Sequence, residues 1–151
     1  MKATLRLDDQ LCFALYAASR AMTATYRRLL EELGLTYPQY LAMLVLWERD
    51  SLTVGELGEQ LLLDSGTLTP LLKRLESAGL VSRVRRPEDE RSVLITLTDA
   101  GRALRDKANP IPDQLLCQTG MAPEDVIQLR EELKTLTARL VTDTSNEGNT
   151  P

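Results

Sequence analysis

Residues 52–98 read LTVGELGEQLLLDSGTLTPLLKRLESAGLVSRVRRPEDERSVLITLT, and this stretch decides the fold. Thr53 is followed three residues later by Glu56, a capping-box pattern that predicts the start of one short helix. Asp64 and Ser65 are suitable cap residues for a second helix directly after it. The stretch therefore begins with two short helices joined by a tight turn.

The second of these helices has two chemically different faces. Its apolar positions recur at helical spacing and predict a buried stripe. The stripe consists of Leu68, Leu71, Leu72 and Leu75. The opposite face carries hydroxyl and basic side chains, which suit phosphate oxygens and base edges. These candidate DNA-binding residues are Ser65, Thr67, Thr69, Lys73 and Arg74.

After the second helix the pattern changes to that of a β-hairpin. Residues 80–86 and 92–98 are rich in β-branched residues and arginines, with a charged turn at residues 87–90 between them. Arginines on such a ribbon suit phosphates or a narrow minor groove. The candidate DNA-binding arginines of this wing are Arg83, Arg85, Arg86 and Arg91.

Small domains that read DNA place a helix pair before a basic hairpin, so that one helix enters a groove and the ribbon lies beside it. A protein-docking helix pair is the plainer alternative, and surface arginines usually serve solubility. The net charge of −4 is a weak objection to DNA binding, because residues 64–98 hold six basic against five acidic side chains. The capped pair, the polar face and the hairpin in this order favour DNA binding.

Composition limits the remaining classes of protein. With 151 residues, 43% of them hydrophobic, the chain has the size of one domain with a core of its own. It has no histidine, which excludes histidine-dependent catalysis and a cysteine–histidine zinc site, and we expect no cofactor and no metal. Two distant cysteines do not form a disulfide framework, and no apolar run reaches the length of a membrane span. We therefore expect a cytoplasmic protein without membrane partners.

Helices flank the central stretch on both sides. An apolar stripe predicts a long helix over residues 9–33. Thr36 and Gln39 form another capping box and open a helix that is apolar nearly all round, which places it in the core. A helix capped by Thr98 follows the hairpin, and prolines interrupt the chain before a last helix that starts at Pro123.

Two groups of motifs make the chain resemble a known family. Residues 63–70, LDSGTLTP, and Asp89-Glu90-Arg91 in the hairpin look like the MarR family of winged helix-turn-helix repressors. Residues 11–16, LCFALY, and 36–40, TYPQY, resemble its organic-hydroperoxide-sensing branch, the OhrR type. The resemblance extends from about residue 8 to about residue 140. It implies a mainly α fold with a small β-wing (α+β), and a homodimer that leaves a pseudo-palindromic double-stranded operator when an organic hydroperoxide oxidises the N-terminal cysteine.

The family architecture implies how the chain divides. Residues 1–142 are expected to form a single winged helix-turn-helix domain, with a DNA-binding lobe at about 36–98. Dimerisation helices are expected at about 9–33 and 110–142. The polar tail 143–151 is expected to be disordered.

The resemblance also assigns roles to individual side chains. Cys12 is the peroxide-sensing cysteine, and Tyr26 and Tyr37 occupy positions at which the family places two tyrosines that hydrogen-bond the reactive sulfur. Asp89 and Arg91 match an acid and an arginine that form a salt bridge at the wing tip. Taken on chemistry alone, a lone cysteine on an apolar helical face is usually an inert packing residue, and the tyrosines pack in the core.

Helix geometry limits which tyrosine reaches Cys12. Tyr26 lies 14 residues further along the same predicted helix, roughly 21 Å of axial rise. A hydrogen bond between them must therefore cross a dimer interface in which the two helices run in opposite directions. Tyr16 is one turn from Cys12 and is a local candidate for the same hydrogen bond.

The second cysteine, Cys117, distinguishes two subtypes within the resemblance. Family members with a second cysteine in the C-terminal region form a disulfide, and Cys117 matches that position. We expect a sulfenic acid at Cys12 to be captured by Cys117, most simply that of the partner subunit, although sequence alone does not separate a bond within a subunit from one between subunits. The plainer alternative is that Cys117, beside Leu115 and Leu116, is simply buried.

Two alternative functions stay open at this point. A thiol peroxidase that uses both cysteines needs a basic residue to activate the thiolate, and it leaves the helix pair and the wing unexplained, so we expect no enzyme. A MarR-type repressor released by a phenolic ligand, with incidental cysteines, explains the DNA-reading parts as well. The leucine-rich surroundings of Cys12 favour apolar organic hydroperoxides over hydrogen peroxide.

Overall fold

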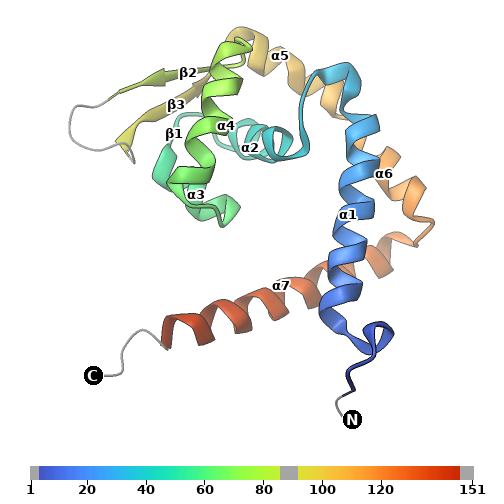
Figure 1. Ribbon diagram of the computed structural model, residues 1–151. Helices are drawn as coiled ribbons and strands as arrows, with labels where there is room; N and C mark the ends of the chain where they lie inside the picture. The colour runs from blue at the N-terminus through green and yellow to red at the C-terminus, as the bar shows by residue number, and fades with distance from the viewer. Residues whose placement is uncertain (1–3, 86–91, 147–151) are drawn as a thin grey trace. The chain divides into compact units, whose positions relative to one another are not determined.

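The computed structural model describes residues 4–85 and 92–146 and is mainly helical with one small sheet (Figure 1). This content confirms the expected α+β class. The chain divides into two compact units, residues 1–111 and 112–151. In chain order the elements are α1 (Leu11–Leu29), α2 (Tyr37–Glu48), β1 (Leu52–Thr53), α3 (Val54–Leu61), α4 (Ser65–Ser77), β2 (Val81–Val84), β3 (Leu94–Leu97), α5 (Asp99–Ala108), α6 (Ile111–Thr119) and α7 (Pro123–Asn146).

Local sequence signals build the helix pair α3–α4 as predicted. The Thr53–Glu56 capping box is complete: the Thr53 hydroxyl accepts from the Glu56 N–H at 3.2 Å, and the Glu56 carboxylate accepts from the Thr53 N–H at 2.8 Å. At the start of α4 the Asp64 carboxylate accepts from the Thr67 N–H at 2.7 Å. Each helix therefore begins where its cap residue lies.

The turn between α3 and α4 depends on backbone conformation. Leu62 ends α3 in the left-handed region with φ of 55°. Gly58 lies directly against the following backbone, because a Cβ at this position would be 2.7 Å from the Leu63 carbonyl oxygen. A residue without a side chain is therefore required for so tight a turn.

Leucines dominate the core of the first unit. The predicted stripe of α4 is buried: Leu68, Leu72 and Leu75 are fully inaccessible and Leu71 nearly so. The prediction that α2 is buried nearly all round is wrong at Leu44, which is 39% exposed. The helices α1, α3, α4 and α5 all contact α2 and nevertheless leave Leu44 accessible.

The wing belongs to a three-stranded antiparallel sheet of order β1-β3-β2. Val81 pairs with Leu97 in the predicted hairpin, and Leu52 of the two-residue strand β1 pairs with Ile95. The sequence pattern missed β1, because two residues show no alternation. The regular strands are also shorter than the predicted segments 80–86 and 92–98. The predicted turn, Arg86 and the Asp89–Arg91 salt bridge lie outside the described residues.

The long N-terminal helix is shorter than predicted. Instead of residues 9–33, α1 spans Leu11–Leu29, with short 3₁₀ turns at Leu7–Asp9 and Glu31–Leu33. Gly34, with φ of 65°, ends the helical segment as predicted. No residue of α1 is buried in the single chain, although it carries an apolar stripe. Its exposed apolar side chains include Leu11, Phe13, Tyr16 and Met22.

The second unit is a helical segment. The predicted interruption ends earlier than expected, since α6 begins at Ile111, with Pro112 in the first turn, where a backbone donor is not needed. The last helix, α7, starts at Pro123 as predicted and continues to Asn146. The end of α7 thus overlaps residues 143–146 of the tail that was expected to be disordered, and residues 147–151 lie outside the described part. In the described residues no helix is long and apolar enough to cross a membrane.

Asp50 joins the end of α2 to β3 and α5. Its Oδ1 accepts from the N–H groups of Leu97 at 2.9 Å and Ser51 at 2.7 Å, and its Oδ2 pairs with Arg102 at 3.2 Å. Burial acts to raise the pKa of this carboxyl. The hydrogen bonds from Leu97, Ser51 and Arg102 outweigh burial and hold the pKa below its ordinary value.

Candidate functional site

The structure gives α4 the two faces that a DNA-reading helix needs. Opposite its buried leucines, Thr67, Lys73 and Arg74 are exposed, and Ser65 and Thr69 are half-buried. Pro70 lies inside the helix and is exposed. The five predicted side chains of this helix are thus available on one element.

The N-terminus of α4 is occupied by its own cap. The exposed Asp64 carboxylate accepts from the Thr67 N–H, and this hydrogen bond lowers the pKa of Asp64. An ionised carboxylate at this position satisfies the free N–H and interacts with the helix dipole. The Asp64 carboxylate therefore satisfies the Thr67 N–H at the start of α4.

The wing arginines differ in placement. Arg85 is exposed beside β2. Arg83 is only 8% exposed in its side chain, and its guanidinium pairs with Glu76 of α4 at 3.8 Å. Its Nε is buried and has no hydrogen-bond partner within the described residues. Arg83 thus connects β2 to α4 in the single chain, and its contact with DNA stays a prediction.

Both cysteine side chains are exposed in the single chain. Cys12 lies in the first turn of α1, and Cys117 lies on α6 in the second unit. The alternative that Cys117 is simply buried does not fit its exposure. In the described residues, no group of three or more carboxylates and cysteines is placed to hold a metal ion.

Two of the three predicted tyrosines lie together. The Tyr26 ring, near the C-terminal end of α1, stacks on the Tyr37 ring of α2 with centroids 4.6 Å apart. Burial, followed by the neighbouring phenols of Tyr40 and Tyr37, raises the pKa of Tyr26 to about 12, and burial also raises the pKa of Tyr37. Both phenols are therefore protonated hydrogen-bond donors near neutral pH.

The third tyrosine is placed differently. Tyr16 is 60% exposed, and the Arg20 guanidinium lies over its ring at 5.5 Å from the centroid. Tyr16 is close to Cys12 along α1, whereas Tyr26 is near the other end of the same helix. The structure thus separates the thiol from the Tyr26–Tyr37 pair within one chain.

Sequence reasoning missed two aromatic residues that continue the tyrosine pair. The Tyr40 ring lies 5.6 Å from that of Tyr26, and the Trp47 ring lies 6.4 Å from that of Tyr40. The signal was present in the helical spacing, since Tyr37, Tyr40 and Trp47 fall on one face of α2.

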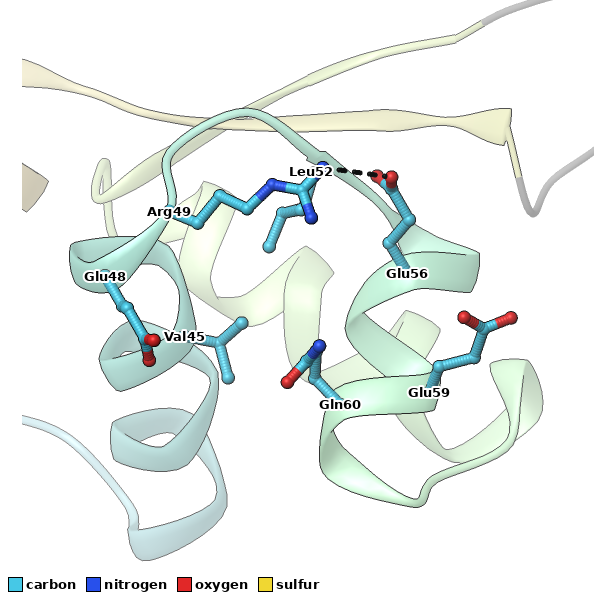
Figure 2. A pocket seen from close by; sticks show the side chains of 7 residues that line it. All are labelled: Val45, Glu48, Arg49, Leu52, Glu56, Glu59 and Gln60. Carbon is cyan, nitrogen blue, oxygen red and sulfur yellow. Dashed lines mark hydrogen bonds and ion pairs between the residues drawn. The ribbon is translucent and has the colours of Figure 1, made fainter.

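A cavity of about 190 Å³ opens between α2 and α3 (Figure 2). Arg49, just after α2, reaches Glu56 of α3 across it at 3.4 Å, and Val45 and Leu52 supply apolar wall. None of the predicted site residues lines this cavity.

The chain is similar to known regulators in sequence and in structure. The family model for transcriptional regulator SarA/Rot matches residues 24–108. The organic hydroperoxide resistance transcriptional regulator of Bacillus subtilis (strain 168) is 56% identical over 132 residues, which are 87% of this chain and 90% of that protein.

Solved structures of AbfR, a protein of Staphylococcus epidermidis, share the fold. Reduced AbfR bound to DNA matches with a TM-score of 0.74 at 37% identity, over 91% of this chain and 96% of that chain. Disulfide-formed AbfR matches with a TM-score of 0.62 at 39% identity, over 88% of this chain and 93% of that chain.

Proposed function

The chain belongs to the MarR family of winged helix-turn-helix transcriptional regulators, and on that premise we propose that it is a repressor that leaves its operator DNA when an organic hydroperoxide oxidises Cys12. Like its relatives, it is a DNA-binding regulator and not an enzyme. The observation that carries the sensing proposal is the placement of an exposed thiol at one end of α1 and a pair of protonated tyrosines at the other.

Operator binding follows from the two faces of α4. We assign the major-groove contacts to this helix and the flanking backbone contacts to the wing. The proposed contacting side chains are Ser65, Thr67, Thr69, Lys73, Arg74, Arg83 and Arg85, together with Arg86 and Arg91, which lie outside the described residues. In the single chain the Arg83 guanidinium pairs with Glu76 of α4, so this arginine contacts DNA only if the pair rearranges.

A homodimer brings the thiol and the tyrosines together. Cys12 and Tyr26 are separated by roughly 21 Å along one helix, so the Tyr26–Tyr37 pair of a chain cannot reach its own Cys12. If two α1 helices pair in opposite directions, each thiol lies beside the tyrosine pair of the other subunit. The exposed apolar side chains of α1 supply the contact area for such a pairing. The double-stranded operator is then a pseudo-palindrome with half-sites about one helical turn apart.

The oxidation is a two-electron reaction. The Cys12 thiolate attacks the O–O bond of the hydroperoxide, which gives a sulfenic acid at sulfur and releases an alkoxide that takes up a proton to become the alcohol. The Cys117 thiol then attacks the sulfenic sulfur, and the products are a disulfide and water. The O–H groups of Tyr26 and Tyr37 stabilise the thiolate before attack, because both remain protonated.

The disulfide releases DNA by changing the spacing of the two recognition helices. Closing a bond between α1 of one subunit and α6 of the other moves the dimerisation helices. Two α4 helices that must both fit half-sites about 34 Å apart tolerate only a small change.

A gel-shift titration on the DNA upstream of the gene tests the proposal. The reduced protein is expected to bind, to lose binding after about one equivalent of an organic hydroperoxide, and to recover with dithiothreitol. Cys12→Ser is expected to bind and to ignore peroxide, and Cys117→Ser to form no disulfide to Cys12. If wild-type binding does not respond to peroxide but a phenolic ligand weakens it in a variant without cysteines, thiol sensing is refuted and small-molecule release takes its place.

A further inference from the structure

Four aromatic rings, one from α1 and three from α2, form a continuous line. The Tyr37 and Tyr26 rings stack at 4.6 Å between centroids, and Tyr40 follows Tyr26 at 5.6 Å. Trp47 meets Tyr40 edge-on at 6.4 Å. Each separation lies in the range over which aromatic rings attract one another. We call Tyr37, Tyr26, Tyr40 and Trp47 the aromatic line.

At the Trp47 end of the aromatic line, a side-chain hydrogen bond connects the ring to the backbone of α5. Trp47 Nε1 donates a hydrogen bond of 2.9 Å to the carbonyl oxygen of Gly101, in the first turn of α5. Gly101 has no room for a side chain, because a Cβ there would overlap the carbonyl oxygen of Leu80. The position of Trp47 is therefore coupled to the segment that joins α4 to β2.

Thr98 closes the same connection from the other side. Its hydroxyl oxygen accepts from the Gly101 N–H at 3.1 Å and donates to the Gly79 carbonyl oxygen at 2.6 Å. The N–H of Leu80 bonds in turn to the carbonyl oxygen of Leu75 in α4 at 3.1 Å. Hydrogen bonds thus join the start of α5 to the segment between α4 and β2, where the helix ends and the wing begins (Figure 1).

We propose that the aromatic line transmits the state of the Tyr26–Tyr37 pair to the recognition helix and the wing, and that Trp47 is the positioning residue at its end. This inference rests on the proposed function, because oxidation at Cys12 is the event that displaces the two tyrosines. A close-packed interior answers a displaced side chain by repacking between discrete arrangements. The thiol therefore controls DNA affinity without touching the DNA-reading face.

The first experiment uses the only tryptophan of the chain as its own reporter. The emission of Trp47 is recorded for the reduced protein, after about one equivalent of an organic hydroperoxide, and after dithiothreitol. Excitation is at the red edge of the tryptophan band, where tyrosine does not absorb. We expect the emission to shift at the same rate as DNA is released and to recover on reduction. Unchanged emission in a protein that has released its DNA overturns the proposal.

The second experiment removes the directional contact but keeps a ring. Trp47→Phe cannot donate to the Gly101 carbonyl oxygen, so we expect its reduced form to bind DNA and its disulfide to form as in the wild type. The ratio of reduced to oxidised DNA affinity is expected to fall by about tenfold. Trp47→Phe that releases DNA as completely as the wild type overturns the proposal.

A matched control separates coupling from loss of packing. Leu104→Ala truncates a partly buried side chain of α5 that is not part of the aromatic line. We expect this variant to keep the wild-type affinity ratio, and an equal fall in both variants overturns a specific role for Trp47. Failure of the proposed function is distinguishable, because the wild type itself then keeps its DNA after oxidation. If Trp47→Phe does not fold, the emission of the wild type decides alone.

Discussion

Gly101→Ala is expected to destabilise the protein, although helix propensity alone predicts that alanine stabilises α5. Gly101 is buried in α5, where alanine is favoured over glycine by about 1 kcal/mol. A Cβ at this position, however, overlaps the Leu80 carbonyl oxygen, so α5 or the segment before β2 has to move by about 1 Å to reach an ordinary contact. Such overpacking costs about 1–3 kcal/mol.

The same movement weakens two hydrogen bonds. The contacts from Trp47 Nε1 to Gly101 and from Thr98 to Gly79 contribute about 1 kcal/mol each. With the helix gain subtracted, we expect Gly101→Ala to lower the free energy of unfolding by about 2–3 kcal/mol. For a chain of this size the melting temperature then falls by about 8 °C.

Thermal unfolding followed by far-ultraviolet circular dichroism measures this change. Ala103→Gly is the matched control, because it changes propensity on an exposed position of the same helix without a steric conflict, and it should cost about 1 kcal/mol. If Gly101→Ala melts at or above the wild-type temperature, the close approach of α5 to Leu80 is wrong. The connection that we propose from Trp47 to the recognition helix would then lose its support.

Three further predictions concern charge. Asp50→Asn is expected to lower the free energy of unfolding by about 1–2 kcal/mol near neutral pH, because the pKa of the Asp50 carboxyl is lowered in the fold. The stability advantage of the wild type is complete above the ordinary pKa of aspartate and shrinks as the pH falls through the lowered pKa of the folded state. Urea unfolding at several pH values measures this difference. Lys73→Ala is expected to reduce the slope of log affinity for DNA against log salt by about 1, whereas Lys107→Ala, exposed on α5, leaves it unchanged. Glu76→Ala is expected to lower the free energy of unfolding by about 2 kcal/mol, because it leaves the buried Arg83 guanidinium without this carboxylate. The double variant Glu76→Ala/Arg83→Met should regain most of this stability in urea unfolding. A double variant as unstable as Glu76→Ala alone would contradict the pairing.

Features encoded by neighbouring residues could be predicted from the sequence. The capping boxes of α2 and α3, the cap of α4 at Asp64 and the buried leucine stripe all appear in the structure as expected. Each depends on side chains within one or two helical turns, so spacing alone is sufficient. The family motif at residues 63–70 added the identity of the DNA-reading helix to this local pattern.

Features that depend on distant pairing could not be predicted. Arg83 looks like a phosphate ligand when only its strand is considered, and its burial follows from the packing of β2 against Glu76 of α4. Strand β1 exists only because β3 supplies the hydrogen-bonding partners for Leu52 and Thr53. The contact from Trp47 to Gly101 spans 54 residues and has no local signature.

The Tyr26 and Tyr37 phenols do not titrate near neutral pH. The chain has no histidine, and burial keeps the Tyr26 and Tyr37 phenols protonated well above neutrality. The hydrogen bonds that we propose for the Cys12 thiolate are therefore available unchanged across the physiological pH range. It follows that these two phenols add no pH dependence of their own to the oxidation near neutrality.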